Sequence, residues 1–162
     1  MAEYAKDKKL YAIKVIRKDV LIEYNQIKNT KLEKDIMFKC QHQFLVGMEF
    51  LFMSDLRLFF VMPFIRGGEL YRFFKAKRRF QENEVKFYAC QIALALGYLH
   101  KKGIVHRDLK LDNILVKGIG SNDLRIKMID FGMSKITGKG NKKINLSTYC
   151  GTIDFIAPEI FE

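Results

Sequence analysis

A polar loop at residues 106–113 constrains this chain most, because it sets two carboxylates, one lysine and one amide a few positions apart. The strongest helical pattern of the chain, at 83–100, precedes this loop, and a short β-branched run at 114–116 follows it as a predicted strand. A further carboxylate, Asp130, comes later, directly before a Phe-Gly pair. A single aspartate in a loop is usually a turn former, but this ordered set favours a site with chemistry.

The composition is that of one globular domain. The chain has 162 residues, of which 49% are hydrophobic, so it can bury a real core. No apolar run approaches the roughly 18 residues that span a bilayer, and residues 1–9 lack the apolar segment of a secretory signal. Cys40, Cys90 and Cys150 form neither a metal-ligand spacing nor a disulfide framework. We therefore expect a cytoplasmic, intracellular protein without a transmembrane segment.

The net charge of +11 raises the question of a nucleic-acid partner. The lysines are spread widely, and the two local clusters, at 75–79 and 139–143, do not form a long basic tract. No motif interleaves aromatic and basic residues. The charge therefore predicts solvated helix ends and loops, and no specific nucleic-acid binding.

The secondary-structure pattern divides into a strand-rich first part and a helix-rich second part. A run at 10–16 predicts a strand that places Ala12, Lys14 and Ile16 on one face. The polar, lysine-rich segment 133–156 predicts a mobile loop. The other predicted elements are helices at 25–40, 69–74 and 83–100 and strands at 48–53, 56–62, 114–116 and 125–129. The predicted fold is α+β with two small lobes.

The helix at 83–100 carries a clear apolar periodicity. Polar residues at 81–84 supply its start, and Gly103 follows its end. The predicted buried stripe consists of Val85, Tyr88, Ala89, Ile92, Leu96 and Leu99.

Three motifs in order carry a resemblance to a known family. Residues 106–113 match H-R-D-L-x-x-x-N, 130–132 match D-F-G, and 157–159 match A-P-E. The chain thus resembles a eukaryotic protein kinase domain of the serine/threonine type. The resemblance implies that Asp108 accepts the proton of a substrate hydroxyl and that Lys110 neutralises the γ-phosphate of ATP. It also implies that Asn113 and Asp130 bind Mg²⁺, since that cation prefers oxygen ligands.

The resemblance also implies an ATP site. Lys14 lies in a Y-A-I-K run that resembles the kinase V-A-I-K strand, so we expect it to hold the α- and β-phosphates and to pair with Glu33. Residues 63–65 resemble the hinge, where Pro63 would offer its carbonyl and Ile65 its N–H to adenine. The other residues placed around ATP are Ala12, Met62, Glu69 and Leu115. Met37, Met48, His106 and Phe131 resemble the stacked regulatory spine.

Residues 147–152 resemble the T-F-C-G-T activation segment of the AGC group of kinases. Thr148 would then be phosphorylated by an upstream activating kinase and would pair with Arg107. Thr152 would contact Asp108 and Lys110 beneath the substrate. Glu159 of the A-P-E motif belongs to the same segment.

Two acidic positions bear on the protein substrate. Glu69 and Asp112 match positions at which this group favours arginine or lysine upstream of the target serine or threonine. The alternative is that both are exposed carboxylates and that Glu69 caps a helix. A basic protein substrate is therefore a hypothesis at this point.

The resemblance covers residues 1–162, divided into 1–62 for the small lobe, 63–65 for the hinge and 66–162 for the first part of the large lobe. The glycine-rich loop and the later helices have no counterpart in these residues, so we expect a truncated domain with weak or no activity alone. We expect a monomer that is prone to aggregate through exposed Phe87, Ile92, Ile104, Phe155 and Ile160. The alternative function is a non-catalytic, kinase-like interaction module.

Overall fold

The computed structural model describes residues 1–6, 8–118, 120, 124–137 and 151–160. A four-stranded antiparallel sheet of order β1-β2-β4-β3 dominates one end of the molecule. Its strands are β1 (Ala2–Glu3), β2 (Leu10–Arg17), β3 (Phe50–Met53) and β4 (Arg57–Pro63).

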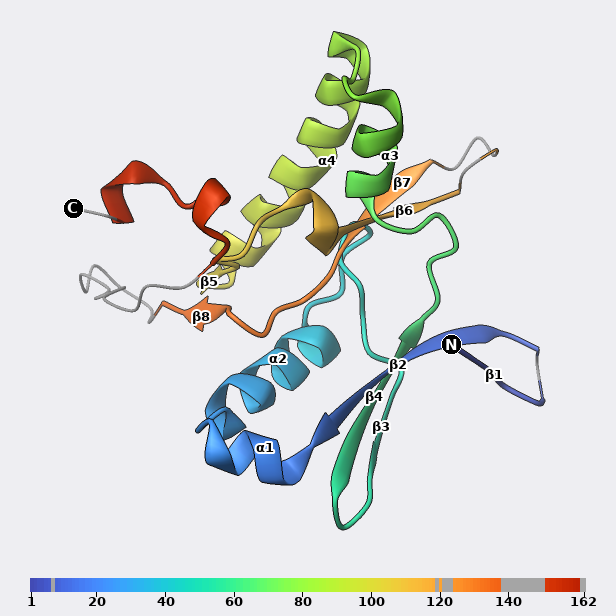
Figure 1. The fold of residues 1–162 in the computed structure, drawn as a ribbon, viewed down its shortest axis with the longest axis vertical. Coiled ribbons are helices and arrows are strands. Elements are labelled where there is room, and N and C mark those ends of the chain that lie inside the picture. Colours follow the sequence, from blue (N-terminus) through green and yellow to red (C-terminus); the bar gives the residue numbers. More distant parts are fainter. Residues whose placement is uncertain (7, 119, 121–123, 138–150, 161–162) are drawn as a thin grey trace.

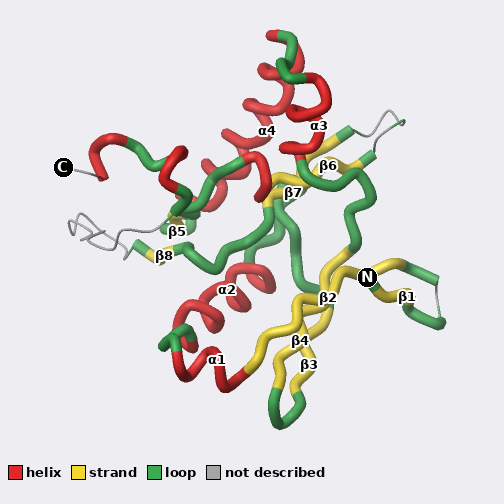
Figure 2. The backbone as a smooth tube through the Cα atoms, in the orientation of Figure 1, coloured by secondary structure: helices red, strands yellow, loops and turns green. Residues whose placement is uncertain are grey.

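Helices occupy both ends of the structure (Figure 1). Helices α1 (Lys18–Glu23) and α2 (Ile27–Lys39) follow β2 and lie beside the sheet. Helices α3 (Leu70–Lys77) and α4 (Glu82–Lys101) form the opposite end. The hairpin of β6 (Ile114–Lys117) and β7 (Arg125–Met128) lies next to α3 (Figure 2). The predicted α+β composition with two groups of elements is confirmed.

Short strands and short helices flank the polar loops between the sheet and the helical end. Strand β5 (Ile104–Val105) pairs with β8 (Lys135–Ile136), and η1 (Leu111–Asn113) precedes β6. The short helices η2 (Ile153–Phe155) and η3 (Pro158–Ile160) end the described chain. The prediction of one loop across 133–156 is therefore wrong at β8 and η2. These elements are too short to show periodicity, and β8 exists through its pairing with β5. Residues 138–150 lie outside the described residues.

The alternation predicted for β2 is confirmed. Lys14 shares a partly buried face with Ala12 and Ile16, whereas Ile13 and Val15 are exposed on the other face. Lys14 pairs with Phe60 of β4 in the antiparallel register. Helix α1, which the sequence did not predict, begins where this strand ends.

The apolar stripe predicted for α4 is partly wrong. The buried residues of this helix are Gln91, Ala95 and Leu99, whereas Val85 and Ala89 are exposed. Gln91 can be buried because its amide oxygen accepts a hydrogen bond from the Ile126 N–H at 3.0 Å. A polar side chain thus occupies the interior face of α4 because β7 supplies its partner.

One hydrophobic core spans both parts of the molecule. It joins α2, the segment 44–48, β4, α4 and the β6–β7 hairpin. The backbone of the segment 44–46 pairs with β7 through Val46 N–H to Met128 O and Met128 N–H to Phe44 O. Ile104 is buried within this core, contrary to the expectation of exposure, because β5 packs between α4 and β8. Phe87 and Phe155 are exposed as expected.

Gly103 provides a test of the turn that links α4 to β5. Its φ of +69° lies in the left-handed region, and an added Cβ would stand 2.7 Å from the carbonyl oxygen of Thr137. We predict that Gly103→Ala lowers the free energy of unfolding by about 1–3 kcal/mol, measured by urea denaturation.

Gly97 is the matched control, because it lies within α4 and a Cβ there would meet nothing within 4 Å. Gly97→Ala should raise the unfolding free energy by about 0.5–1 kcal/mol, since alanine loses less backbone entropy in a helix. Equal effects of the two substitutions would contradict this account of the turn.

Candidate active site

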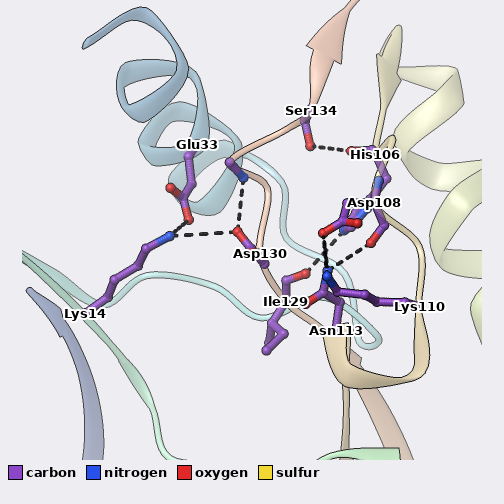
Figure 3. Close-up of polar contacts among 10 residues, drawn as sticks. Lys14, Glu33, His106, Asp108, Lys110, Asn113, Ile129, Asp130 and Ser134 are labelled. Atoms are coloured by element: carbon purple, nitrogen blue, oxygen red, sulfur yellow. Dashed lines mark hydrogen bonds and ion pairs between the residues drawn. The ribbon is translucent and has the colours of Figure 1, made fainter. Parts of the chain in front are cut away.

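An ion pair joins β2 to α2. The Nζ atom of Lys14 lies 2.6 Å from Oε1 of Glu33 and 3.8 Å from Oδ1 of Asp130 (Figure 3). The Glu33 side chain is only 5% exposed, whereas that of Lys14 is 40% exposed. A buried carboxylate needs a cationic partner, and the strand register supplies one. The predicted Lys14–Glu33 contact is therefore present, and Lys14 also faces Asp130.

Asp130 is held by an unusual backbone geometry. Its φ is +63°, a conformation that aspartate tolerates better than most residues, and its Oδ1 accepts a hydrogen bond from the Gly132 N–H at 3.3 Å. A Cβ on residue 132 would stand 3.3 Å from Oδ1 of Asp130 and 3.8 Å from Oε2 of Glu33. Glycine at this position therefore lets the 130–132 turn approach both carboxylates.

Both carboxylate oxygens of Asp108 accept hydrogen bonds from neighbouring side chains. Oδ2 accepts a hydrogen bond from Asn113 Nδ2 at 2.9 Å and lies 3.2 Å from Lys110 Nζ. Oδ1 accepts from the Thr152 hydroxyl at 3.0 Å, and Lys110 Nζ donates to the same hydroxyl at 2.8 Å. The contacts predicted for Thr152 are thus present. Burial raises the pKa of Asp108, but the hydrogen bonds outweigh it and hold that pKa below its usual value. Asp108 is therefore an ionised carboxylate at neutral pH.

His106 supports the loop from beneath. Its Nε2 lies 3.2 Å from the Ile129 carbonyl oxygen, and its Nδ1 lies 3.3 Å from the Asp108 nitrogen. A carbonyl only accepts and an N–H only donates, so the ring is neutral with its proton on Nε2. Burial lowers the pKa of His106, which favours the same state. The ring meets Phe131 edge-on at 5.3 Å between centroids. Met37 and Met48 are buried in the same core, as the spine resemblance predicts.

A cavity of about 590 Å³ lies between the sheet and the helical part. That volume is within the range of small-molecule sites. Each residue that the sequence places around ATP lines it: Ala12, Lys14, Glu33, Met62, Pro63, Ile65, Glu69, Leu115 and Asp130. The structure thus brings together positions from β2, α2, the end of β4 and the β6–β7 region. Their roles toward a nucleotide remain predictions.

The segment after β4 presents one backbone donor to this cavity. The N–H of Phe64 donates to the Leu10 carbonyl at 3.1 Å, which ties the segment to β2. Ile65 is buried and lines the cavity, and its N–H has no acceptor within the described residues. A backbone N–H that lines a cavity and has no protein acceptor is free to donate to a ligand atom or to water. Its predicted role toward adenine remains a prediction.

Other predicted residues stand apart from the cavity. Arg107, at a φ of +68°, donates from Nε to the Met133 carbonyl at 2.5 Å. Its predicted partner Thr148 lies outside the described residues. The backbone of Glu159 lies in η3. Their roles in an activation segment remain predictions.

Sequence reasoning missed five residues of the cavity wall, namely Val46, Arg66, Gly68, Arg72 and Ile129. Val46 comes from a segment without a motif and reaches the cavity only through tertiary packing. Ile129 directly precedes the D-F-G motif. Arg66 and Arg72 flank the Gly67-Gly68 pair and Glu69 in the sequence, so their proximity to a predicted ATP residue was the available signal.

Comparison with known proteins agrees with this geometry. The family model for the protein kinase domain matches residues 1–162. The chain belongs to the protein kinase family. The serine/threonine, AGC-like assignment and the two-lobed kinase fold expected from the motifs are thereby confirmed.

Curated relatives cover nearly all of this kinase chain. It is 40% identical over 154 residues to serine/threonine-protein kinase akt-2 of Caenorhabditis elegans, covering 95% of the chain and 28% of the relative. It is 40% identical to Sgk1-A of Xenopus laevis over 99% of the chain and 36% of the relative. Identity to protein kinase C eta type of Mus musculus is 44% over 94% of the chain and 22% of the relative. The chain thus spans about a third or less of these proteins. Within its described residues, no helix has the length and apolar character to cross a membrane.

The neutral state of His106 predicts a dependence of stability on pH. Its folded pKa is below 6.5, so its contribution to stability is complete above that pH. As the pH falls below 6.5, the unfolded state binds the proton first and the native state loses stability, by at most about 1.4 kcal/mol per pH unit for one group. His106→Gln should reduce this slope between pH 7 and pH 5 in urea denaturation.

One other histidine contributes to this measurement. His42 also has a pKa lowered by burial and by Lys127, so part of the slope should remain in His106→Gln. A slope unchanged by His106→Gln would contradict the assigned neutral state.

Proposed function

We propose that this kinase transfers the γ-phosphoryl group of ATP to serine or threonine hydroxyls of proteins. The observation that carries the proposal is the arrangement of Lys14, Glu33 and Asp130 at the wall of one cavity, with the Asp108 cluster beside it. Phosphoryl transfer depends on positioning and on neutralising charge, and each of these groups supplies one of those parts.

The residues fit a Mg²⁺-ATP complex. Asp130 offers a half-exposed carboxylate. Asn113 uses its amide nitrogen on the backbone oxygen and the carboxylate of Asp108, which leaves its amide oxygen for a cation. In nucleotide sites, Mg²⁺ binds to one or two protein oxygens together with the phosphates of the substrate. The oxygens of Asp130 and Asn113 are therefore sufficient for such an ion. When bound, the ion would neutralise the phosphate charge.

Asp108 is suited to orient the acceptor hydroxyl. As an ionised carboxylate it can accept the hydrogen bond of a serine or threonine hydroxyl and then its proton. Lys110 contacts one oxygen of the carboxylate and Thr152 the other, and these contacts hold it in a fixed orientation toward the acceptor. Lys110 also places a positive charge beside the acceptor, where the transferred phosphoryl group carries negative charge.

Substrates and regulation follow from the family resemblance. We propose protein substrates with basic residues near the acceptor, an upstream activating kinase that acts on Thr148, and a cytoplasmic location. We also propose residues 63–65 as the hinge between a small lobe at 1–62 and a large lobe at 66–162. A non-catalytic interaction module is the alternative, and nucleotide binding separates the two.

Nucleotide binding can be tested by thermal denaturation of the purified chain. At a Mg²⁺-ATP concentration ten times the dissociation constant, binding should add about 1.4 kcal/mol of stability and raise the Tm by several degrees. Lys14→Ala and Asp130→Ala should abolish that shift. Lys31→Ala, on the exposed side of α2, should retain it. A wild-type chain without any shift would favour the interaction module.

Catalysis can be tested in the full-length protein. Asp108→Asn removes the proton acceptor but keeps the size of the side chain, so kcat should fall by about 10²–10⁴-fold. Asp55→Asn, in the exposed turn between β3 and β4, is the control and should keep kcat. Phosphorylation of a serine peptide measured with labelled ATP decides the matter, and an unchanged kcat in Asp108→Asn would reject the assigned role.

A further inference from the structure

Two arginines line the nucleotide cavity next to Glu69. Arg66 lies just before the Gly67-Gly68 turn, and Arg72 lies in the first turn of α3. Both are exposed, and both line the same cavity as Glu69. Two arginines and one glutamate from this short segment therefore contribute to the lining of the cavity.

Neither arginine is explained by the stability of the fold. The first turn of a helix has unpaired N–H groups and a partial positive charge, which disfavour a cation such as Arg72. Within the described residues neither guanidinium forms an ion pair. The stem of Arg72 lies near Gly68, since its Cδ would be 4.0 Å from a Cβ added there. The side chain is thus laid along the turn that borders the cavity.

Within the described residues, the Glu69 carboxylate also forms no hydrogen bond or ion pair. Glu69 is the N-cap residue of α3, but its side chain makes no capping hydrogen bond. The backbone of Glu69 holds the position instead, through its carbonyl bond to the Arg72 N–H at 3.1 Å and its bridge to Leu115. Glu69 is thus at the helix-cap position that the alternative gives it, but its side chain does not cap α3, so its carboxylate can interact with a ligand or with the arginines.

We propose that Arg66 and Arg72 are specificity-determining residues that exclude arginine and lysine of a peptide substrate from Glu69. The inference rests on the proposed protein kinase function. A cationic side chain that approaches Glu69 meets two like charges, and such repulsion discriminates between partners. An acidic side chain at the same position meets two cations instead. Asp112, in η1 beside the catalytic loop, then remains the carboxylate that reads a basic residue.

Peptide binding to the full-length protein tests this inference without requiring turnover. Fluorescent serine peptides that carry Arg, Ala or Glu at each upstream position are titrated in the presence of Mg²⁺ and a non-hydrolysable ATP analogue. In the wild type, the peptide position read by Asp112 should bind most tightly with Arg. The second position, which faces Glu69, should bind more tightly with Glu than with Arg. In Arg66→Ala/Arg72→Ala, the Arg-to-Ala affinity ratio at the second position should rise by about fivefold, as expected for two exposed charge interactions.

Two matched variants separate local charge from other effects. Arg66→Lys/Arg72→Lys keeps the charge and should keep the wild-type ranking of peptides. Lys75→Ala/Arg79→Ala removes the same number of charges outside the cavity and should also keep that ranking. Thermal denaturation of each variant confirms that it is folded.

Four outcomes decide the inference. It is overturned if the wild type already prefers Arg at both positions or binds no peptide. It is also overturned if Arg66→Ala/Arg72→Ala changes only nucleotide affinity, since the arginines would then serve the nucleotide. If the peptide affinities follow the predicted ranking but the protein transfers no phosphate, the result supports the inference and rejects the proposed catalysis.

Discussion

The buried carboxylate of Glu33 is the constraint on which the rest of the site depends. Its side chain is 5% exposed, and an unpaired charge at that depth would cost several kcal/mol. Lys14 supplies the partner from β2, so α2 must pack against the sheet in one register. The same lysine then stands 3.8 Å from Asp130, which brings the turn at 130–132 to the cavity. One ion pair thus couples a strand, a helix and a loop that are far apart in the sequence.

The second constraint is the hydrogen-bond network beneath Asp108. His106 joins the loop to Ile129, and Asn113 ties the same loop to the backbone and carboxylate of Asp108. These bonds are satisfied only while His106 is neutral and Asp108 is ionised, because each state decides which atoms donate. Burial and neighbouring donors set both states. The chemistry of the loop therefore depends on the packing of the core below it.

Side-chain periodicity predicted the long elements, and motifs predicted the members of the site. The alternation of β2 correctly placed Lys14 and Ala12 on one face, because a strand has a strict period of two. The burial of Gln91 was not predictable, since it depends on the Ile126 N–H of a strand 35 residues away. Strand β8 and helix α1 were missed because short elements carry too few residues for a pattern. Val46 reaches the cavity without any sequence signal.

The sequence by itself determined the family, the candidate chemistry and the faces of the long elements, because these depend on residue types at fixed spacing. Only the tertiary structure decided which charges meet. It brought Lys14, Glu33 and Asp130 within contact distance and placed Thr152 on both Asp108 and Lys110. It also decided that Arg66, Glu69 and Arg72, which are neighbours in the sequence, all line one cavity. Electrostatic interactions depend on distance and burial, and neither quantity is encoded in local spacing.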